Sequence, residues 1–475
     1  MGNSRKLNSS ASLLAHVEHM LQPIIPAGSA IVLGLSGGVD SVVLLHLLQQ
    51  ISPRHAWRLR ALHVHHGISP QADAWAAFCA ALCEELAVPV QVERVDIAPL
   101  RELGIEAAAR KLRHAALLRQ QAGFVALAHH LDDQVETMLL QLLRGAGVRG
   151  ASAMPLIKRV SPHIPSPLMG GGGGEGELPR NPTVLRPLLD VPRAALVSYA
   201  QQHALQWVED ESNTDDSYPR NFLRQRVLPL LEQRFPAYRA TLARSARHFA
   251  EAGELLDDLA RQDARGAIAN GRLDVEQLRE LGAIRGKNLL RYFLAAQGAP
   301  IPDSTRMEEM LRQLCDARQD ASVCVAWQDW QVRRYRSHVY VMPRLPLPVD
   351  FTLIWNGEAE TPLPSPHGVL CFSPAIGQGI SQQKMRPGTI EIHPRRGGEK
   401  IQPDAARPHR SLKNLLQEHD TLPWQRDVLP LLFCDDELIC VPGVAIDHVY
   451  RARPDEAGVI VRWYPSGMGT AHRAH

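Results

Sequence analysis

Apolar and polar positions alternate in blocks along the first 150 residues, and the blocks predict an α/β domain. Short apolar runs are typical of buried strands, and each is followed by a stretch whose apolar residues recur with helical spacing. The predicted strands cover 30–35, 59–64, 88–95 and 124–128, and the predicted helices cover 39–51, 72–86, 106–122 and 133–143. Because strands and helices alternate, we expect a parallel sheet with helices on both faces.

The rest of the chain predicts two smaller domains, since 475 residues exceed what one core usually holds. Helical spacing over 273–317 favours a mainly helical middle domain, 228–348, which also has strand-like alternation over 327–345. A small α+β domain is expected over 385–465. The remaining boundaries are a catalytic domain over 1–227, a Pro- and Gly-rich linker over 349–384 and a tail over 466–475.

One segment departs from this pattern. Residues 161–182 hold a run of five glycines among prolines. Such a composition cannot bury enough apolar surface to order itself. We interpret it as an inserted surface loop between two strands of the first domain.

The first predicted strand runs into the string SGGVDS, residues 36–41, and then into a helix. The first N–H groups of a helix lack internal partners and attract anions, and adjacent glycines let a phosphate approach the backbone. The string lacks the lysine of a Walker A loop. Its acid, Asp40, either caps the loop or reaches the phosphates through a cation such as Mg²⁺.

Two further polar clusters follow strands, at 63–69 and 129–136, and should meet the first at the carboxyl edge of the sheet. Asp133 and Glu136 are three residues apart and share a helix face, with Asp132 beside them. Acids this close repel one another unless they share a cation or a substrate ammonium group. His65 and His129 are candidates to flank a nucleotide.

Charge and cysteine content narrow the class of protein. Seven arginines stand against one acid over 217–247, and eight Lys and Arg against three acids over 384–413. Clustered cations of this kind suit a polyanion such as RNA. The seven cysteines form no CxxC pair, which favours reduced thiols in a cytoplasmic protein. No apolar run is long enough to cross a membrane.

The string SGGVDS resembles the pyrophosphate loop of the N-type ATP pyrophosphatases, the PP-loop superfamily. Together with HVHHG, EAAARKLR, AHHLDDQVET, RNFLR and the C-terminal HPRRGGEKIQP and RSLKNLLQE, the sequence resembles the tRNA(Ile)-lysidine synthases over most of its length. The resemblance implies a Rossmann-like, adenine nucleotide alpha hydrolase-like first domain. It also implies ATP-dependent ligation of free L-lysine onto C2 of the wobble cytidine of a tRNA(Ile) with a CAU anticodon, through an O2-adenylated intermediate. Family precedent favours a homodimer.

The resemblance also implies roles for particular residues. ATP would be bound by Ser36, Gly37, Gly38, Val39, Asp40, Ser41, His65 and His129. Asp40 or Asp132 would hold Mg²⁺, Asp133 and Glu136 would bind the lysine ammonium, and Arg113, with Arg110 as alternative, would neutralise the α-phosphate. The catalytic set is therefore Asp40, Arg113, Asp132, Asp133 and Glu136. The expected tRNA contacts are Arg220, Arg224, Arg395, Arg396, Lys400 and Lys413.

Two other functions stay open at this point. Another AMP-activating member of the superfamily, such as a tRNA thiolase or an amidotransferase-type GMP synthetase, would share the loop. A tRNA thiolase would be expected to carry a CxxC pair. A non-catalytic RNA-binding protein on a decayed nucleotide fold would not be expected to retain Asp40, Asp132, Asp133 and Glu136.

Overall fold

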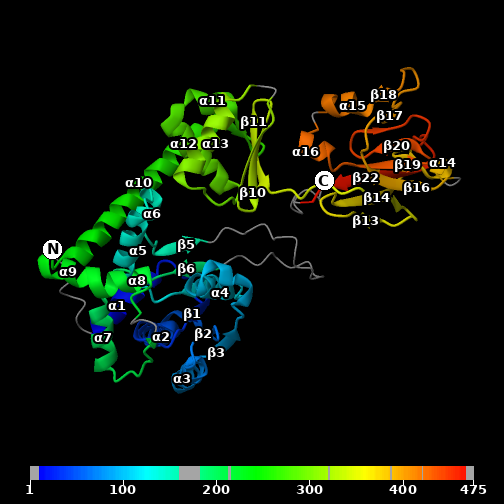
Figure 1. The fold of residues 1–475 in the computed structure, drawn as a ribbon. Helices are drawn as coiled ribbons and strands as arrows, with labels where there is room; N and C mark the ends of the chain where they lie inside the picture. The colour runs from blue at the N-terminus through cyan, green and yellow to red at the C-terminus, as the bar shows by residue number, and fades with distance from the viewer. Residues whose placement is uncertain are drawn as a thin grey trace. The chain divides into compact units, whose positions relative to one another are not determined.

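The computed structural model describes residues 10–159, 182–211, 215–318, 321–385, 388–419 and 421–466. The expected insertion over 161–182 lies, except for its last residue, outside the described residues, as does all but the first residue of the expected tail. The chain forms two compact units, the first ending at Asp258 and the second beginning at Leu259 (Figure 1). Within the described residues, no helix combines the length and apolar character needed to cross a bilayer.

The first unit is built on a six-stranded sheet with the order β3-β2-β1-β4-β6-β5. All neighbouring strands are parallel except the edge strand β5, which runs antiparallel to β6. The expectation of a parallel sheet is therefore right for five strands, and the antiparallel edge was not predicted. The strands are β1 (Ala30–Gly34), β2 (Arg58–His65), β3 (Val90–Arg94), β4 (Phe124–Ala126), β5 (Ile157–Arg159) and β6 (Thr183–Leu185).

Helices cover both faces of this sheet, and their apolar sides form two cores. One core joins β1 to α2, in which Leu44, Leu45 and Leu48 are fully buried. The other packs α4 against Val32 and Val125 of the sheet. The helices of this unit are α1 (Ser10–Leu21), α2 (Val39–Ile51), α3 (Ala72–Glu85), α4 (Ile105–Leu118), α5 (Leu131–Leu143), α6 (Val148–Ala151), α7 (Arg193–Gln202), α8 (Pro219–Phe222), α9 (Leu228–Arg234) and the first part of α10 (Tyr238–Ala267), which continues into the second unit.

The segment after residue 227 does not leave the first unit at once. Leu228 and Tyr238 pack on Val135 of α5 and form a small core of their own. Between α8 and α9, residues Leu223–Val227 form a π-helical turn, a local widening that is frequent at functional sites. The segment RNFLR, which lies in α8 and this turn, is thereby followed directly by residues that pack against α5.

The second unit begins with helices packed on an antiparallel sheet with the order β7-β8-β11-β10-β9. The middle region is therefore helical only in part, because the alternating residues of 327–345 form two of its strands. Its elements are β7 (Ile268–Ala269), β8 (Arg272–Asp274), α11 (Val275–Glu280), α12 (Gly282–Ala296), α13 (Ser304–Asp316), β9 (Val323–Trp327), β10 (Trp330–Tyr335) and β11 (His338–Pro343).

The C-terminal part combines a five-stranded and a four-stranded antiparallel sheet. Its elements are β12 (Leu353–Ile354), β13 (Glu360–Pro362), β14 (Val369–Ile376), β15 (Ile380–Ser381), α14 (Gln382–Met385), β16 (Ile390–Pro394), β17 (Lys400–Ile401), β18 (Arg410–Ser411), α15 (Leu412–Glu418), α16 (Pro423–Arg426), β19 (Pro430–Cys434), β20 (Glu437–Val441), β21 (Ala445–Ile446) and β22 (Ala457–Tyr464).

The interpretation of 349–384 as a linker needs correction. The segment contains β12 to β15, and β14 pairs with β22 over eight consecutive residues. Leu370 and Phe372 of β14 are buried in the shared core. The prolines and glycines that suggested a linker lie mostly in the turns between these strands, and they masked the alternation of apolar residues along β14.

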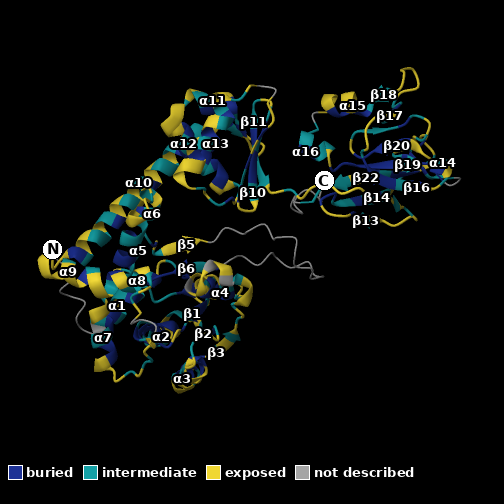
Figure 2. Ribbon diagram, viewed as in Figure 1, coloured by how far each residue is buried: buried dark blue, intermediate teal, exposed yellow. Residues whose placement is uncertain are grey.

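A large-to-small substitution tests the packing of the second unit. Phe293 on α12 is fully buried, as the dark core of Figure 2 illustrates for this unit. Replacing Phe293 with Ala should lower the free energy of unfolding by about 3–5 kcal/mol, because a cavity replaces the ring. Ile284 on the same helix is 85% exposed, so Ile284→Ala should change it by no more than about 0.5 kcal/mol. Urea denaturation of both variants measures the difference, and equal losses would contradict this packing.

Candidate functional site

Three polar clusters meet at the carboxyl edge of the first sheet. β1 lies between β2 and β4, with Gly34 opposite Leu62 and Leu33 opposite Ala126. The residues that follow these three strands therefore lie side by side. This arrangement confirms the prediction that the segments at 36–41, 63–69 and 129–136 converge.

The loop after β1 holds its shape through internal hydrogen bonds. The hydroxyl groups of Ser36 and Ser41 lie 3.1 Å apart, and the Ser41 hydroxyl donates to the Gly38 carbonyl at 2.9 Å. Gly37 has φ +88°, and a Cβ there would lie 2.8 Å from Cγ2 of Val208. Gly38 caps α2 without a side-chain hydrogen bond, so the first N–H groups of this helix remain available to an anion.

Asp40, on the first turn of α2, has an oxygen without a hydrogen-bond partner. Its Oδ1 is buried and makes no hydrogen bond within the described part of the chain. Its Oδ2 lies 3.6 Å from Nε2 of His130, and Nε of Arg193 is 3.9 Å from Oδ1. A buried carboxylate oxygen with free lone pairs is a suitable ligand for a hard cation such as Mg²⁺.

Two histidines of the edge, His66 and His129, have lowered pKa values and are incompletely paired. Burial, reinforced by nearby Arg113, lowers the pKa of His66 to about 4. Burial also lowers the pKa of His129 to about 3, against the opposing charge of Asp133. Nδ1 of each ring is buried without a hydrogen-bond partner among the described residues. His65, by contrast, is occupied by Asp73 at 3.2 Å.

Asp133 and Glu136 are neutralised by two arginines from the RNFLR segment. Glu136, which is 0% exposed, accepts from Nε of Arg220 at 2.6 Å and from Nε of Arg224 at 2.7 Å. Arg220 also donates to Asp133 at 2.8 Å. The residues expected to bind lysine and those expected to bind tRNA are thus paired with each other in this structure. The cation that relieves the repulsion of the acids is supplied by the protein.

Asp132 is occupied in a similar way. Its Oδ1 accepts from Nε of Arg239 at 2.5 Å, and its Oδ2 accepts from the backbone N–H of Arg193 at 3.0 Å. Burial raises the pKa of Asp132, but these donors outweigh burial and leave it below its ordinary value. Asp40 therefore offers a metal ion an oxygen free of hydrogen bonds, whereas both oxygens of Asp132 accept one.

His130 joins the loop to the acidic helix, a role that the sequence did not single out. Nδ1 of its ring accepts from the backbone N–H of Asp133 at 3.4 Å, and the backbone N–H of His130 donates to Oδ2 of Asp133 at 3.0 Å, which closes a capping box on α5. Burial lowers the pKa of His130, but contact with Asp40 and the charge of Asp133 outweigh it and raise the pKa. A buried N-cap histidine has no sequence signature apart from its place before DDxxE.

Other expected residues lie apart from this network. Arg113 donates to Nε2 of His66 at 3.3 Å, on the β2 side of the loop. Arg395 and Arg396 are in the C-terminal part, where Arg396 pairs with Asp350 at 3.2 Å and Arg395 with Glu399 at 3.5 Å. Lys400 and Lys413 are exposed and have no ion pair in the described part of the chain.

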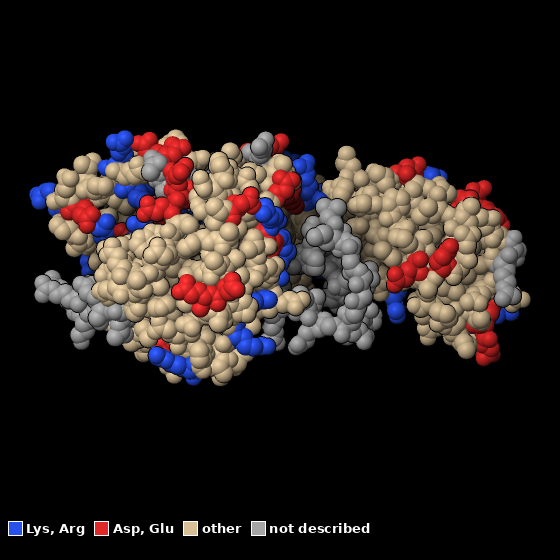
Figure 3. All heavy atoms as spheres, turned by 90° about the horizontal axis from the view of Figure 1, so that it is seen from below, with Lys and Arg blue, Asp and Glu red and all other residues tan. Residues whose placement is uncertain are grey.

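The basic segments are less basic in three dimensions than along the chain. Of the seven arginines in 217–247, four pair with carboxylates: Arg220, Arg224, Arg226 and Arg239. On the face shown in Figure 3, blue and red side chains are intermixed and form no continuous basic patch. The surplus of positive charge available to a polyanion is therefore carried by fewer side chains than the sequence suggested.

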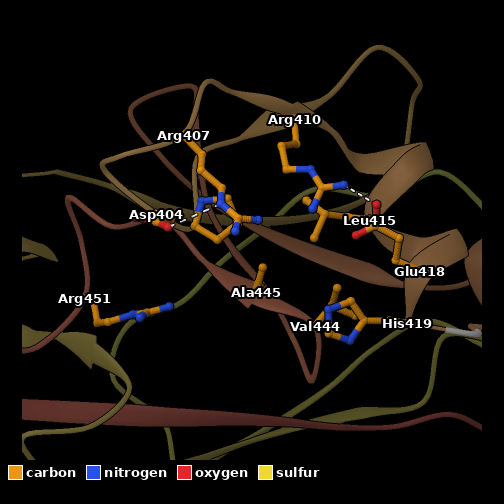
Figure 4. A pocket seen from close by; sticks show the side chains of 10 residues that line it. Asp404, Arg407, Arg410, Leu415, Glu418, His419, Val444, Ala445 and Arg451 are labelled. Carbon is orange, nitrogen blue, oxygen red and sulfur yellow. Dashed lines mark hydrogen bonds and ion pairs between the residues drawn. The ribbon is translucent and has the colours of Figure 1, made fainter.

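A cavity of about 220 Å³ lined by charged residues of both signs was not predicted from the sequence (Figure 4). It lies in the C-terminal part, and Arg407, Arg410, Arg451 and His419 contribute to its lining. Arg407 pairs with Asp404 and Arg410 with Glu418, while Arg451 reaches toward the cavity from the segment before β22. Arg407 and Arg410 lie three residues apart within the basic segment 384–413, whereas Arg451 comes from a distant loop, so the sequence did not show that they share a cavity.

Comparison with family models assigns three regions of the chain. Residues 9–231 match the PP-loop domain, residues 273–340 the TilS substrate binding domain and residues 390–463 the TilS substrate C-terminal domain. The described site lies within the first of these regions.

The curated relatives match over nearly the whole length. The tRNA(Ile)-lysidine synthase of Nitrosomonas europaea is 43% identical over 449 residues, which cover 94% of each chain. That of Coxiella burnetii is 36% identical over 444 residues, 93% of this chain and 94% of its own. Among solved structures, the U34-tRNA thiolase NcsA from Methanococcus maripaludis aligns with a TM-score of 0.39 and 17% identity, over 51% of this chain and 79% of that chain, a likeness too weak to argue from.

The buried position of Glu136 leads to a stability prediction. Glu136→Gln leaves two guanidinium groups without their shared charge, and breaking such a buried pair should cost about 3–5 kcal/mol. Glu232→Gln removes an exposed carboxylate that also pairs with an arginine, and should cost no more than about 1 kcal/mol. Urea denaturation of the two variants compares them. Equal stability of Glu136→Gln and wild type would show that this carboxylate does not hold the arginines in solution.

Proposed function

We propose how the residues of this chain carry out its reaction. The chain belongs to the tRNA(Ile)-lysidine synthase family and has that family's ATP-dependent ligase activity. The first unit would transfer AMP from ATP to O2 of the wobble cytidine and then join lysine to C2. The observation that carries the proposal is the Asp40 oxygen that makes no hydrogen bond, beside the uncapped N-terminus of α2 and on the same sheet edge as Asp133.

The first step needs a stabilised leaving group. The N–H groups at the start of α2 and the hydroxyl groups of Ser36 and Ser41 would bind the departing pyrophosphate, where its charge develops. Asp40 would hold Mg²⁺, which supplies charge neutralisation to the phosphates when bound. Arg113, held by His66, would neutralise the α-phosphate. Transfer of AMP makes O2 of the cytidine a good leaving group, so that C2 becomes open to an amine.

The second step needs a deprotonated lysine ε-amine. We assign the ammonium to Asp133, which has a small exposed fraction, and assign Glu136 to holding Arg220 and Arg224 because it is wholly buried. Nδ1 of the neutral His129 ring is available to accept a hydrogen bond from the amine. Loss of the proton to a carboxylate or imidazole at this edge would free the nitrogen lone pair for attack on C2.

tRNA would be bound by basic residues of both units. Lys400 and Lys413 fit phosphate contacts because they are exposed and carry no ion pair among the described residues. Arg395 and Arg396 would first have to leave Glu399 and Asp350. Arg220 and Arg224 are partly exposed at the active-site edge and could meet the anticodon loop without leaving Glu136.

The rival functions fit the site less well. A thiolase needs reactive thiols, whereas burial raises the pKa of Cys79 to about 12 and that of Cys83 to about 11. These thiols stay protonated at neutral pH and are poor nucleophiles. In a non-catalytic protein with a decayed nucleotide fold, the buried Asp40 oxygen that makes no hydrogen bond would destabilise the fold without serving a reaction.

The function is tested by product analysis. The full-length protein is incubated with ATP, Mg²⁺, labelled lysine and a tRNA(Ile) transcript with a CAU anticodon, and the nucleosides are separated. We expect label in a lysine-modified cytidine, and none when the transcript carries a GAU anticodon. Label in both transcripts, or in neither, would contradict the proposed substrate.

The pyrophosphate loop leads to a kinetic prediction. Asp40→Asn and Ser36→Ala should each reduce AMP transfer by about 10²–10³-fold, because each removes a preorganised contact to developing charge. Glu84→Gln, an exposed carboxylate on α3, serves as the matched control and should leave the rate unchanged. Pyrophosphate release is measured for all three, together with thermal unfolding. A normal rate in either loop variant would remove that residue from the proposed role.

The phosphate contacts lead to a salt-dependence prediction. Replacing Lys400 and Lys413 together with Gln should weaken tRNA binding and reduce the log–log salt slope by about two units, since each contact contributes about one. The KM for lysine should not change. Filter binding at several salt concentrations measures the slope, and an unchanged slope would place the tRNA elsewhere.

A further inference from the structure

Buried polar atoms without hydrogen-bond partners gather at the carboxyl edge of the first sheet. They include Oδ1 of Asp40, Nδ1 of His66, Nδ1 of His129 and Nε of Arg186. Buried polar groups in native proteins are nearly always paired, so each exception needs a reason. Asp40 and His129 already have proposed roles toward Mg²⁺ and ATP, and His66 accepts a hydrogen bond from Arg113. Arg186 has no role in the reaction described so far.

Arg186 follows β6 and is 7% exposed. One guanidinium nitrogen donates to the Pro155 carbonyl at 2.8 Å, and no carboxylate of the described residues lies within ion-pair distance. Burial, with repulsion from Arg110, lowers its pKa to about 10, and it still carries its charge at neutral pH. A buried cation without a counter-charge costs several kcal/mol, so an anion from outside the chain would stabilise it.

Further cations surround this position. Arg110 and His114 are one turn apart on α4, and Lys158 stands on β5 opposite Val184, two residues before Arg186. The charges of Lys158, Arg186 and Arg110 add to burial in lowering the pKa of His114. These groups form a positive field on the β6 side of the sheet edge.

The two sides of His129 differ in how their charges are paired. β4 lies between β1 and β6, so His129 follows the strand that separates Arg186 from the phosphate loop. Its ring lies in the field of one negative charge, Asp133, and of three positive charges: Arg186, Arg220 and Arg110. A ligand lying across His129 would meet Asp133, which shares Arg220, at one end, and Arg186, which has no ion pair among the described residues, at the other. This matches a zwitterion with a positive and a negative group at opposite ends.

We propose that Arg186, assisted by Arg110, binds the α-carboxylate of the amino-acid substrate while Asp133 receives its side-chain ammonium. The proposal rests on the proposed function, because it supplies the second end of the lysine site. A planar guanidinium matches a carboxylate in geometry. The depth of Arg186 favours a small carboxylate over an RNA phosphate, since backbone phosphates of a tRNA loop contact exposed cations.

The test compares lysine with lysinamide, in which a neutral amide replaces the carboxylate. Full-length wild type, Arg186→Gln, Arg110→Gln and the exposed control Arg144→Gln are assayed for both substrates. For wild type and the control, the KM for lysinamide should exceed that for lysine by about tenfold or more, as expected for a lost charge-assisted hydrogen bond. In Arg186→Gln the KM for lysine should rise by a similar factor, whereas the KM for lysinamide should equal that of wild type. Arg110→Gln, at an exposed position, should show a smaller shift of the same kind.

Two further readouts keep the outcomes distinct. AMP transfer to tRNA without lysine, and tRNA affinity, are measured on the same preparations. Normal AMP transfer with equal KM values for lysine and lysinamide in wild type would overturn the carboxylate site and leave the proposed function intact. A loss of tRNA affinity in Arg186→Gln, with an unchanged KM for lysine, would assign the cations to an RNA phosphate and overturn the proposal. No AMP transfer by wild type would overturn the proposed function itself.

Discussion

The arrangement of the site depends on one buried carboxylate, Glu136, which holds two guanidinium groups at once. Its oxygens accept from Arg220 and Arg224 at 2.6 and 2.7 Å, at a position with no exposure to solvent. Through this contact the π-helical turn between α8 and α9 is fixed to α5, and α5 is capped by His130, which reaches Asp40 of the phosphate loop. Charge balance thus connects the segment of the PP-loop domain proposed to bind nucleotide with the segment proposed to meet the RNA.

At the same edge, some charged side chains form ion pairs within the protein, and others keep buried atoms that make no hydrogen bond. Asp132, Asp133 and Glu136 are neutralised by arginines, which lets three acids share one helix start without repulsion. Asp40, His129 and Arg186 retain buried atoms without partners. In a folded chain such atoms are costly, so their concentration at the strand ends indicates where ligands of opposite polarity complete the structure.

The sequence was sufficient for the elements that carry the nucleotide loop and for the convergence of the three polar clusters. Helix α2 spans the predicted residues, 39–51. Apolar side chains lie on nearly every side of this helix, and the glycine loop determines where it begins. The ion pairs could not be predicted, because Arg220 and Glu136 are 84 residues apart and the local sequence around either residue does not identify its partner. Arg186 follows a three-residue strand, and its burial depends on how β5 returns antiparallel beside it. The strands over 349–384 were missed because prolines and glycines in their turns outweighed a short alternation.

The central claim is that the loop at the start of α2 serves an AMP transfer to tRNA, made before lysine takes part. It is tested by incubating the full-length protein with a CAU-anticodon tRNA(Ile) transcript and ATP labelled at the α-phosphate or the γ-phosphate, in the absence of lysine. The account predicts that α-label appears on the tRNA, that γ-label appears only in pyrophosphate, and that added lysine releases the α-label as AMP. Release of γ-label as inorganic phosphate with formation of ADP, or no α-label on tRNA that is nevertheless modified when lysine is added, would contradict it.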